Sequence, residues 1–228
     1  MNELQIDTNC LKEETLILQQ LEDLATLLTA AGHSCNFSGI SYGKMGIVIF
    51  LFHYSRQTQN ISFENTAEEL INEIQTAIHI DFPISYTDGL TGIGTGIEYL
   101  AQHNFLAINT DEFLDDFDTT FAGQIHNRKL YLSYQDLTDM KRFFEARLEN
   151  PQTKKREFLN QTMADILTLL ELHDRVSVTF EEAYVWKLSP DDTANLGLEG
   201  QAGKGLTLLS KLDSQHNSWL KLRLINAV

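Results

Sequence analysis

Three stretches of the chain repeat apolar residues at helical spacing and keep the opposite side polar, which predicts amphipathic α-helices. Their apolar positions are Ile17, Leu21, Leu24 and Leu28 within Leu11–Ala31; Phe63, Ala67, Leu70, Ile74 and Ile78; and Leu159, Met163, Ile166 and Leu170. Gly32 is placed to stop the first helix, Ser62 to cap the second, and Pro151 to occupy the first turn of the third. The polar backs predict that these helices form an outer layer.

Between these stretches lie three shorter segments, 45–54, 92–102 and 137–148, which are predicted to be inner helices. The first is apolar nearly all round, a pattern typical of a helix that is buried on several sides. Segment 176–188 alone has a β-like composition, with valine and phenylalanine in alternation. We predict a connecting loop there, with room for a short hairpin.

The chain repeats itself at a nearly fixed period, as helical-repeat proteins do. Residues 43–47 (GKMGI) overlay residues 89–93 (GLTGI) at an offset of 46, and these overlay residues 136–140 (DLTDM) at an offset of 47. Residues 197–200 (GLEG) overlay residues 89–92 as a fourth copy, and a one-residue insertion is then needed to align the glycines that follow. The repeat predicts α-hairpins of about 47 residues, each entered through a glycine-bearing turn that permits positive φ and close helix approach.

Stacked hairpins form either an open solenoid or a closed two-layer toroid. A solenoid leaves both helix layers partly exposed, whereas the predicted inner helices are strongly apolar. We therefore predict an all-α protein, an α/α toroid-like array of helical hairpins or an incomplete barrel of that kind, in a single domain spanning residues 1–228.

The charge balance is strongly acidic, since 32 Asp and Glu residues against 17 Lys and Arg give a formal net charge of −15. Such a field repels phosphates and anionic lipid, so no nucleic-acid and no membrane role is expected, and a basic partner fits more easily. The N-terminus shows no secretion signal, and the longest apolar run, Ile47–Phe52, is too short to span a bilayer. We expect a cytoplasmic location.

The stretch 197–209 (GLEGQAGKGLTLL) contains a Gly-Lys pair but does not fit a phosphate-binding loop. The leading glycine of that motif would fall on Leu198, and the hydroxyl residue that ligates magnesium would fall on Gly205. The glycines therefore indicate a helix-start turn.

Three segments carry a resemblance to a known family: 38–56 (SGISYGKMGIVIFLFHYSR), 86–106 (YTDGLTGIGTGIEYLAQHNFL) and 196–213 (LGLEGQAGKGLTLLSKLD). The first two resemble the N-terminal repeats, and the third the final repeat, of the lanthionine synthetase C-like (LanC-like) family, Bacteroidetes type. The resemblance covers about two thirds of the chain. It implies an α/α toroid in which the turns before the inner helices face a shared cavity.

Active members of that family hold zinc through a W-C-x-G turn and a C-H-G turn. The metal favours the substrate thiolate, which then adds to a dehydrated residue to close a thioether ring. Here Trp186 is followed by Lys187, and no cysteine follows Cys35. Four turns also make fewer hairpins than the seven of the family, which predicts that the zinc-bearing repeats are missing. We therefore predict no zinc site and no other cofactor.

The other residues that could form a metal site or a charged binding site have ordinary structural explanations. His33 and Cys35 could form an unorthodox metal site with His53 or Cys10, but nothing fixes their separations and core or helix-end roles are favoured. The segment 111–118 (DEFLDDFD) places five acids at the start of an outer helix. Acids suit that end of the helix dipole, so a solvated face is expected, although it could attract a basic peptide.

Acidic residues at the turns could supply the carboxylate pair of a glycosidase, which needs a defined separation. They are Asp88, Asp136, Asp139, Asp191, Asp192 and Glu199. Helix capping is the favoured role of Asp88 and Asp136.

The first functional hypothesis is a zinc-free LanC-like protein that binds a peptide or protein partner in a modified-peptide, lanthipeptide-type pathway, rather than a competent cyclase. The turn residues that would line its shared face are Tyr42, Lys44, Asp88, Asp136 and Glu199. Two alternatives remain open: a carbohydrate-active hydrolase that uses acidic turn residues, and a structural helical-repeat interaction module. No catalytic residue is assigned.

Overall fold

The computed structural model describes residues 3–79, 82–127, 132–176, 195–212, 219 and 222. The regular structure in these residues is entirely helical, with no strand, which confirms the all-α prediction. The helices are α1 (Glu3–Gly32), α2 (Lys44–Thr58), α3 (Ile61–Ala77), α4 (Leu90–Gln102), α5 (Thr110–Phe113), α6 (Asp115–Asn127), α7 (Tyr134–Glu149), α8 (Arg156–Val176) and α9 (Gln201–Leu212). Of the segment predicted as a loop with a hairpin, Val176 ends α8 and residues 177–188 lie outside the described part.

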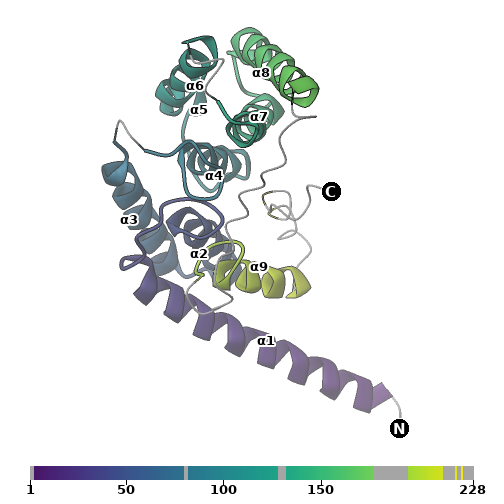
Figure 1. Cartoon of the computed structure of the whole chain (residues 1–228). Helices are drawn as coiled ribbons and strands as arrows, with labels where there is room; N and C mark the ends of the chain where they lie inside the picture. Colours follow the sequence, from purple (N-terminus) through teal and green to yellow (C-terminus); the bar gives the residue numbers. More distant parts are fainter. Residues whose placement is uncertain are drawn as a thin grey trace. The chain divides into compact units, whose positions relative to one another are not determined.

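The helices belong to two compact units (Figure 1). Unit 1 comprises Met1–Ile78 and Asp192–Val228 and contains α1, α2, α3 and α9; unit 2 comprises His79–Asp191 and contains α4 to α8. The first hairpin and the last helix of the chain therefore share one unit. None of the described helices combines the length and the hydropathy that a bilayer-spanning helix needs.

In unit 1, α2 is the central helix, as its apolar sequence predicts. All its residues from Met45 to Ser55 are buried, and it packs against α1, α3 and α9 (Figure 1). Helices α1 and α3 each bury one face. In α1, Ile17, Leu21 and Leu28 are in the core, while most of the side chains described between Lys12 and Gly32 are exposed. The prediction of inner and outer helices holds here.

In unit 2, α4 is buried from Thr91 to Leu100 and packs on α7, which packs in turn on α8. The rings of Phe121, Phe143 and Phe144 meet edge to face and fill the core beside α6. Aromatic pairs in this geometry add to the stabilisation that burial gives.

Several predicted helix limits need correction. Helix α1 begins at Glu3 instead of residue 11, and Gly32 is its last residue. Asn60, not Ser62, caps α3, because its Oδ1 accepts the Ser62 backbone N–H at 3.1 Å. Helix α7 begins at Tyr134, three residues earlier than the repeat predicts.

The first two glycine turns have the same backbone structure. Lys44 N–H donates to the Phe37 carbonyl at 2.9 Å, and Leu90 N–H donates to the Pro83 carbonyl at 2.8 Å. Donors and acceptors are both 46 residues apart, so the sequence period of 46 is also a structural period. Gly43 and Gly89 occupy the N-cap positions with extended backbones.

The last turn belongs to the same class, in a register different from the predicted one. Helix α9 begins at Gln201, so Gly200, and not Gly197, is the counterpart of Gly89. In this register Gly203 matches Gly92 without the insertion that the sequence overlay needed. The turn is one residue shorter, because Gln201 N–H donates to the carbonyl of Asn195, six residues back.

The turn glycines serve close approach and not positive φ, which none of the described glycines adopts. A Cβ on Gly89 would lie 2.2 Å from the Pro83 carbonyl oxygen, and one on Gly200 would lie 1.9 Å from the Asn195 carbonyl oxygen. No side chain fits at such distances, so the tight return of the chain requires glycine.

Two further glycines seat aromatic rings of a neighbouring inner helix. A Cβ on Gly205 of α9 would lie 2.3 Å from the Phe50 ring of α2, and one on Gly94 of α4 would lie 2.5 Å from the Phe143 ring of α7. Gly94 and Gly205 hold the same repeat position. The contact between the last and first inner helices in unit 1 thus uses the same packing as the contact between the second and third in unit 2.

Candidate functional site

Two of the predicted site residues, Tyr42 and Glu199, meet where the first and last turns touch in unit 1. Glu199 N–H donates to the Ser41 carbonyl at 2.9 Å, and Leu198 N–H donates to the Ile40 carbonyl at 3.2 Å. Burial, and then the nearby charge of Glu199, raises the pKa of the Tyr42 phenol. Tyr42 therefore stays protonated at neutral pH and can donate a hydrogen bond.

Lys44 follows Tyr42 closely in sequence, but its charge is taken up by the outer helix α3. Its ammonium forms a short ion pair with Glu73, whose other oxygen contacts His33 Nδ1 at 2.6 Å. The hydrogen bonds from Lys44 and then from His33 lower the pKa of Glu73. Lys44, at the start of α2, thus neutralises the Glu73 carboxylate of α3.

The other two predicted residues, Asp88 and Asp136, are in unit 2 and have different roles. Asp136 completes a capping box at the start of α7, where its Oδ2 accepts the Ser133 N–H at 3.0 Å and Ser133 Oγ accepts the Asp136 N–H. This confirms the capping role of Asp136. Asp88 is not the N-cap of α4, because Gly89 occupies that position.

Asp139, another acidic turn residue, also has a structural role. It is 2% exposed, and it accepts hydrogen bonds from the Tyr86 backbone N–H at 2.9 Å and from Gln135 Nε2 at 2.7 Å. Burial raises the pKa of Asp139, and these two bonds oppose that rise. The Asp139 carboxylate thus connects α7, which follows the third turn, to the backbone of the second turn at Tyr86. Asp191 and Asp192 lie outside the described residues.

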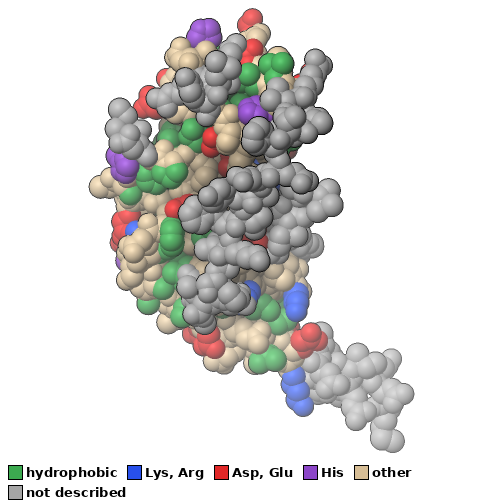
Figure 2. All heavy atoms as spheres, in the orientation of Figure 1, with side chains coloured by type: hydrophobic (Ala, Val, Ile, Leu, Met, Phe, Trp, Pro, Cys, Tyr) green, Lys and Arg blue, Asp and Glu red, His purple; other side chains and the backbone are tan. Residues whose placement is uncertain are grey.

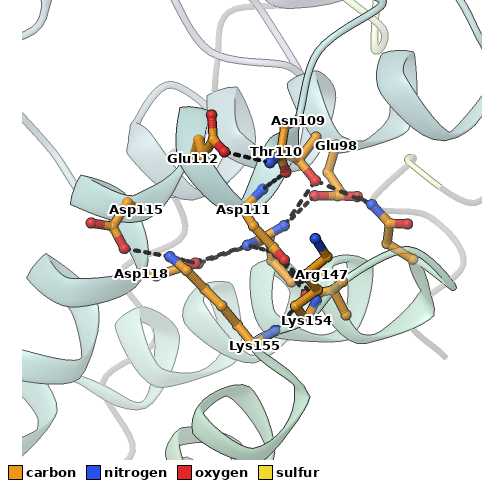
Figure 3. A network of polar contacts seen from close by, with 12 residues as sticks. Glu98, Asn109, Thr110, Asp111, Glu112, Asp115, Asp118, Arg147, Lys154 and Lys155 are labelled. Carbon is orange, nitrogen blue, oxygen red and sulfur yellow. Dashed lines mark hydrogen bonds and ion pairs between the residues drawn. The ribbon is translucent and has the colours of Figure 1, made fainter.

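The most concentrated charge of unit 2 lies around Arg147, which is fully buried on α7 (Figure 3). Its Nε and Nη2 donate to the two oxygens of Asp118 at 3.1 and 2.9 Å. Its Nη1 donates to Glu98 at 2.7 Å and to the Thr110 hydroxyl at 3.0 Å, and Nη2 also donates to Asp111 at 3.0 Å. A guanidinium has five N–H donors, and each of the five donates to an acceptor here.

The carboxylates around Arg147 have further donors. Glu98 Oε1 accepts from Asn150 Nδ2 at 2.6 Å and from Gln102 Nε2 at 3.1 Å. Lys155 reaches Asp118 at 3.3 Å and pairs closely with Asp115. We call the set of Glu98, Thr110, Asp111, Asp118, Arg147 and Asn150 the Arg147 network.

The network joins α4, α5, α6, α7 and the connection between α7 and α8 (Figure 3). Burial lowers the pKa of Arg147, but hydrogen bonds and charge from Asp118 and Glu98 outweigh it, so the net pKa is raised. For the acid Asp111, burial raises the pKa, but hydrogen bonds from Thr153, the Lys154 N–H and Arg147 bring the pKa below its ordinary value. Both groups stay ionised at neutral pH.

This arrangement corrects one part of the prediction that the segment 111–118 is a solvated face: Glu112, Asp115 and Asp116 are exposed, as predicted, but Asp111 and Asp118 are not. Asp118 is fully buried and the Asp111 side chain is only 11% exposed, and both are paired with Arg147. The acids on the accessible face drawn in Figure 2 are dispersed and not gathered into one patch. Two of the five acids of this segment are therefore paired inside the protein, and the other three remain on its surface.

A pocket of about 500 Å³ opens beside the Arg147 network, within the size range of small-molecule sites. Its lining comes from the end of α4, the connection to α5, the start of α5 and the connection between α7 and α8. Gln102, Asp111, Asn150 and Thr153 line the pocket and are also hydrogen-bonded to the network or within it. The buried charges thus lie directly behind the pocket wall.

Within the described residues, no group of three or more His, Cys, Asp or Glu side chains is arranged to hold a metal ion. His33 contacts Glu73, and the Cys35 thiol contacts the Phe37 carbonyl at 3.5 Å. His53 is buried in α2, and the Cys10 side chain lies outside the described part.

Comparisons of the chain with protein-family models, with curated proteins and with solved structures gave no match.

One feature of the sequence does indicate the Arg147 network. Glu98 is the single charged residue of α4, a helix of otherwise apolar, small and polar residues. A charge in such a helix requires a buried partner, and Arg147 lies near the end of another predicted inner helix. The contribution of Asp118, by contrast, depends on how α6 packs, which no local pattern reveals.

Proposed function

We propose that this chain is a zinc-free LanC-like protein of the cytoplasm, with its hairpins in an α/α toroid, that binds a peptide or protein partner in a modified-peptide pathway of the lanthipeptide type. The observation that carries the proposal is the direct pairing of the first and last turns, at residues 40–41 and 198–199. An open solenoid keeps its end repeats apart, so this pairing favours a closed array.

The shared turn geometry also supports the proposal. The turns before α2 and α4 return the chain through the same pair of backbone hydrogen bonds, and the turn before α9 forms the corresponding pair with one residue fewer. In all three turns a glycine directly precedes the helix. These are the segments on which the LanC-like resemblance rests. We infer that the paired turns of unit 1 form the binding face, with Tyr42 and Glu199 at the point where first and last repeats meet.

Binding is favoured over catalysis by what the turn acids do. Asp136 is held in a capping box and Asp139 accepts a buried backbone N–H, so neither is poised as a general acid or base in the way the hydrolase alternative needs. The sequence also lacks both zinc-binding motifs of the cyclases. The net charge of −15 favours a partner that is not itself strongly acidic.

A display library of random peptides, selected on the full chain, tests the proposal. Selected peptides should bind a Tyr42→Ala/Glu199→Gln variant about tenfold more weakly, because these side chains flank the paired turns. A Tyr134→Ala/Glu68→Gln variant, with the same chemistry on the exposed parts of α7 and α3, should bind them like the wild type.

Two results would overturn the proposal. One is equal binding of every selected peptide to wild type and to the turn variant, which would remove the turns from the binding face. The other is stoichiometric zinc in the purified protein, measured by inductively coupled plasma mass spectrometry, which would contradict its zinc-free part.

A further inference from the structure

The pocket beside the Arg147 network contains none of the five predicted turn residues, so its role is a separate question. Buried ion pairs of this kind contribute little net stability, because the cost of desolvating the charges offsets their attraction. Stability alone therefore does not explain a network of four charged side chains directly behind a pocket. The segments that the network holds in place explain it better.

The network fixes one wall of the pocket. Asn150 Oδ1 accepts the Gln152 N–H at 2.9 Å, and Asp111 accepts the Thr153 hydroxyl at 2.6 Å and the Lys154 N–H at 2.7 Å. Since Arg147 holds Asp111, the connection between α7 and α8 is anchored to the buried charge (Figure 3). A wall anchored in this way is preorganised, so a ligand need not order it on binding.

Three side chains of the lining keep unused hydrogen-bonding groups. Gln102 donates both amide hydrogens, to Glu98 and to the Ala146 carbonyl, which leaves its Oε1 as an acceptor. Within the described part of the chain, the Gln152 amide and the Lys154 ammonium form no hydrogen bond or ion pair. The pocket thus offers one acceptor, one amide and one cation.

The charges of the lining select the kind of ligand. Its ionisable residues are one acid, Asp111, and one base, Lys154. Both oxygens of Asp111 already accept hydrogen bonds, and all five donors of Arg147 are used, so Lys154 is the charge available to a ligand. Leu106 and Ile108 add apolar surface to the same pocket.

We propose that this pocket binds an acyl amino acid group, that is, one carboxylate next to an amide with a small apolar side chain. Lys154 pairs with the carboxylate, Gln152 donates to the amide carbonyl, Gln102 Oε1 accepts the amide N–H, and Leu106 and Ile108 contact the side chain. This is the chemistry of a peptide C-terminus. The inference rests on the proposed peptide-binding function and names the part of the peptide that unit 2 holds.

Isothermal titration calorimetry on the full chain tests the assignment with three probes: acetyl-Ala-Ala-Ala with a free carboxylate, the same peptide with a C-terminal amide, and N-acetylalanine. The free acid should bind at least about tenfold more tightly than the amide, as a charge-assisted bond to Lys154 requires. K154Q should abolish this difference. K211Q, which removes an exposed lysine from α9 and so changes the net charge equally, should preserve it.

N-acetylalanine should bind about as tightly as the free-acid tripeptide, because it carries every group that the pocket is proposed to contact. Five outcomes would overturn the assignment: no binding of the free acid at millimolar concentration, equal binding of acid and amide, an unchanged difference in K154Q, its loss in K211Q as well, or no binding of N-acetylalanine. If the tripeptides fail while library-selected peptides still depend on Tyr42 and Glu199, the pocket assignment is lost and the proposed function stands.

Discussion

Replacing Arg147 by methionine should be one of the most damaging single substitutions in this chain. The change keeps an unbranched apolar stem of similar length and removes the cation that satisfies Glu98, Asp111 and Asp118. Glu98 and Asp118 have fully buried side chains, so water cannot take over the lost hydrogen bonds. Lys155 Nζ, at 3.3 Å from Asp118, leaves one positive charge beside that carboxylate.

The size of the loss follows from that burial. Removing one partner of a buried ion pair costs about 3–5 kcal/mol, because the other charge is left uncompensated. Arg147→Met therefore lowers the ratio of folded to unfolded protein roughly 10²- to 10⁴-fold. Arg147→Lys should cost less, at about 2 kcal/mol, because an ammonium keeps the charge but has three donors for five acceptors.

Urea unfolding followed by far-UV circular dichroism measures these losses as changes in the free energy of unfolding. Lys141→Met is the matched control, since Lys141 is on the same helix and forms an exposed i,i+4 pair with Glu145. Its loss should be about 0.3–0.5 kcal/mol. A triple variant, Arg147→Met/Glu98→Gln/Asp118→Asn, should recover more than half of the loss, because it also removes the stranded charges.

If Arg147→Met costs no more than Lys141→Met, the guanidinium does not neutralise buried charge. A second contradictory result would be a triple variant that is less stable than Arg147→Met alone. That result would mean that the lost shape and hydrogen bonds, and not the uncompensated carboxylates, dominate the loss.

Four further substitutions test other parts of the structure by the same urea measurement. Glu73→Gln should destabilise the protein by about 0.5 kcal/mol at pH 7. Since folding lowers the pKa of Glu73, this loss of stability should be present above the ordinary glutamate pKa and should disappear as the pH falls through the lowered value. A loss that persists at pH 2 would contradict this explanation. Gly94→Ala should cost about 1–3 kcal/mol of stability, because the new Cβ forces the Phe143 ring away. Gly123→Ala is the control: nothing lies within 4 Å of its new Cβ, so it should stabilise α6 by up to about 1 kcal/mol. Similar changes in both variants would refute the close packing of Gly94 against Phe143. Asn60→Ala should cost about 1 kcal/mol through loss of the α3 cap, and an unchanged midpoint would show that Asn60 is not the cap.

Hydrophobic spacing predicted most of the fold because it is a local property. The outer helices α1, α3 and α8 and the inner helices α2 and α4 all appear where apolar positions recur at helical spacing or fill a whole segment. Helix limits were less accurate, because capping depends on one or two polar atoms. Asn60 and Ser62 are equally good caps by composition, and only the structure shows which oxygen accepts the N–H.

The site was predicted less well, because its members are far apart in sequence. Arg147 pairs with residues 29 to 49 positions away, and the acids of segment 111–118 look solvent-exposed when only their own helix is considered. The dipole argument placed them correctly at a helix start. It could not show that α7 brings a cation to the same place.

The register of the last turn illustrates the same limit and carries a consequence for the proposed fold. Sequence identity alone aligned Gly197 with Gly89, whereas the structure aligns Gly200, Gly203 and Gly205 with Gly89, Gly92 and Gly94. In the corrected register, Gly205 receives the ring of Phe50 just as Gly94 receives the ring of Phe143. The junction between last and first repeats is then built like an internal junction. A repeat array with interchangeable junctions can lose repeats and still join its two ends, which is what a shortened LanC-like toroid requires.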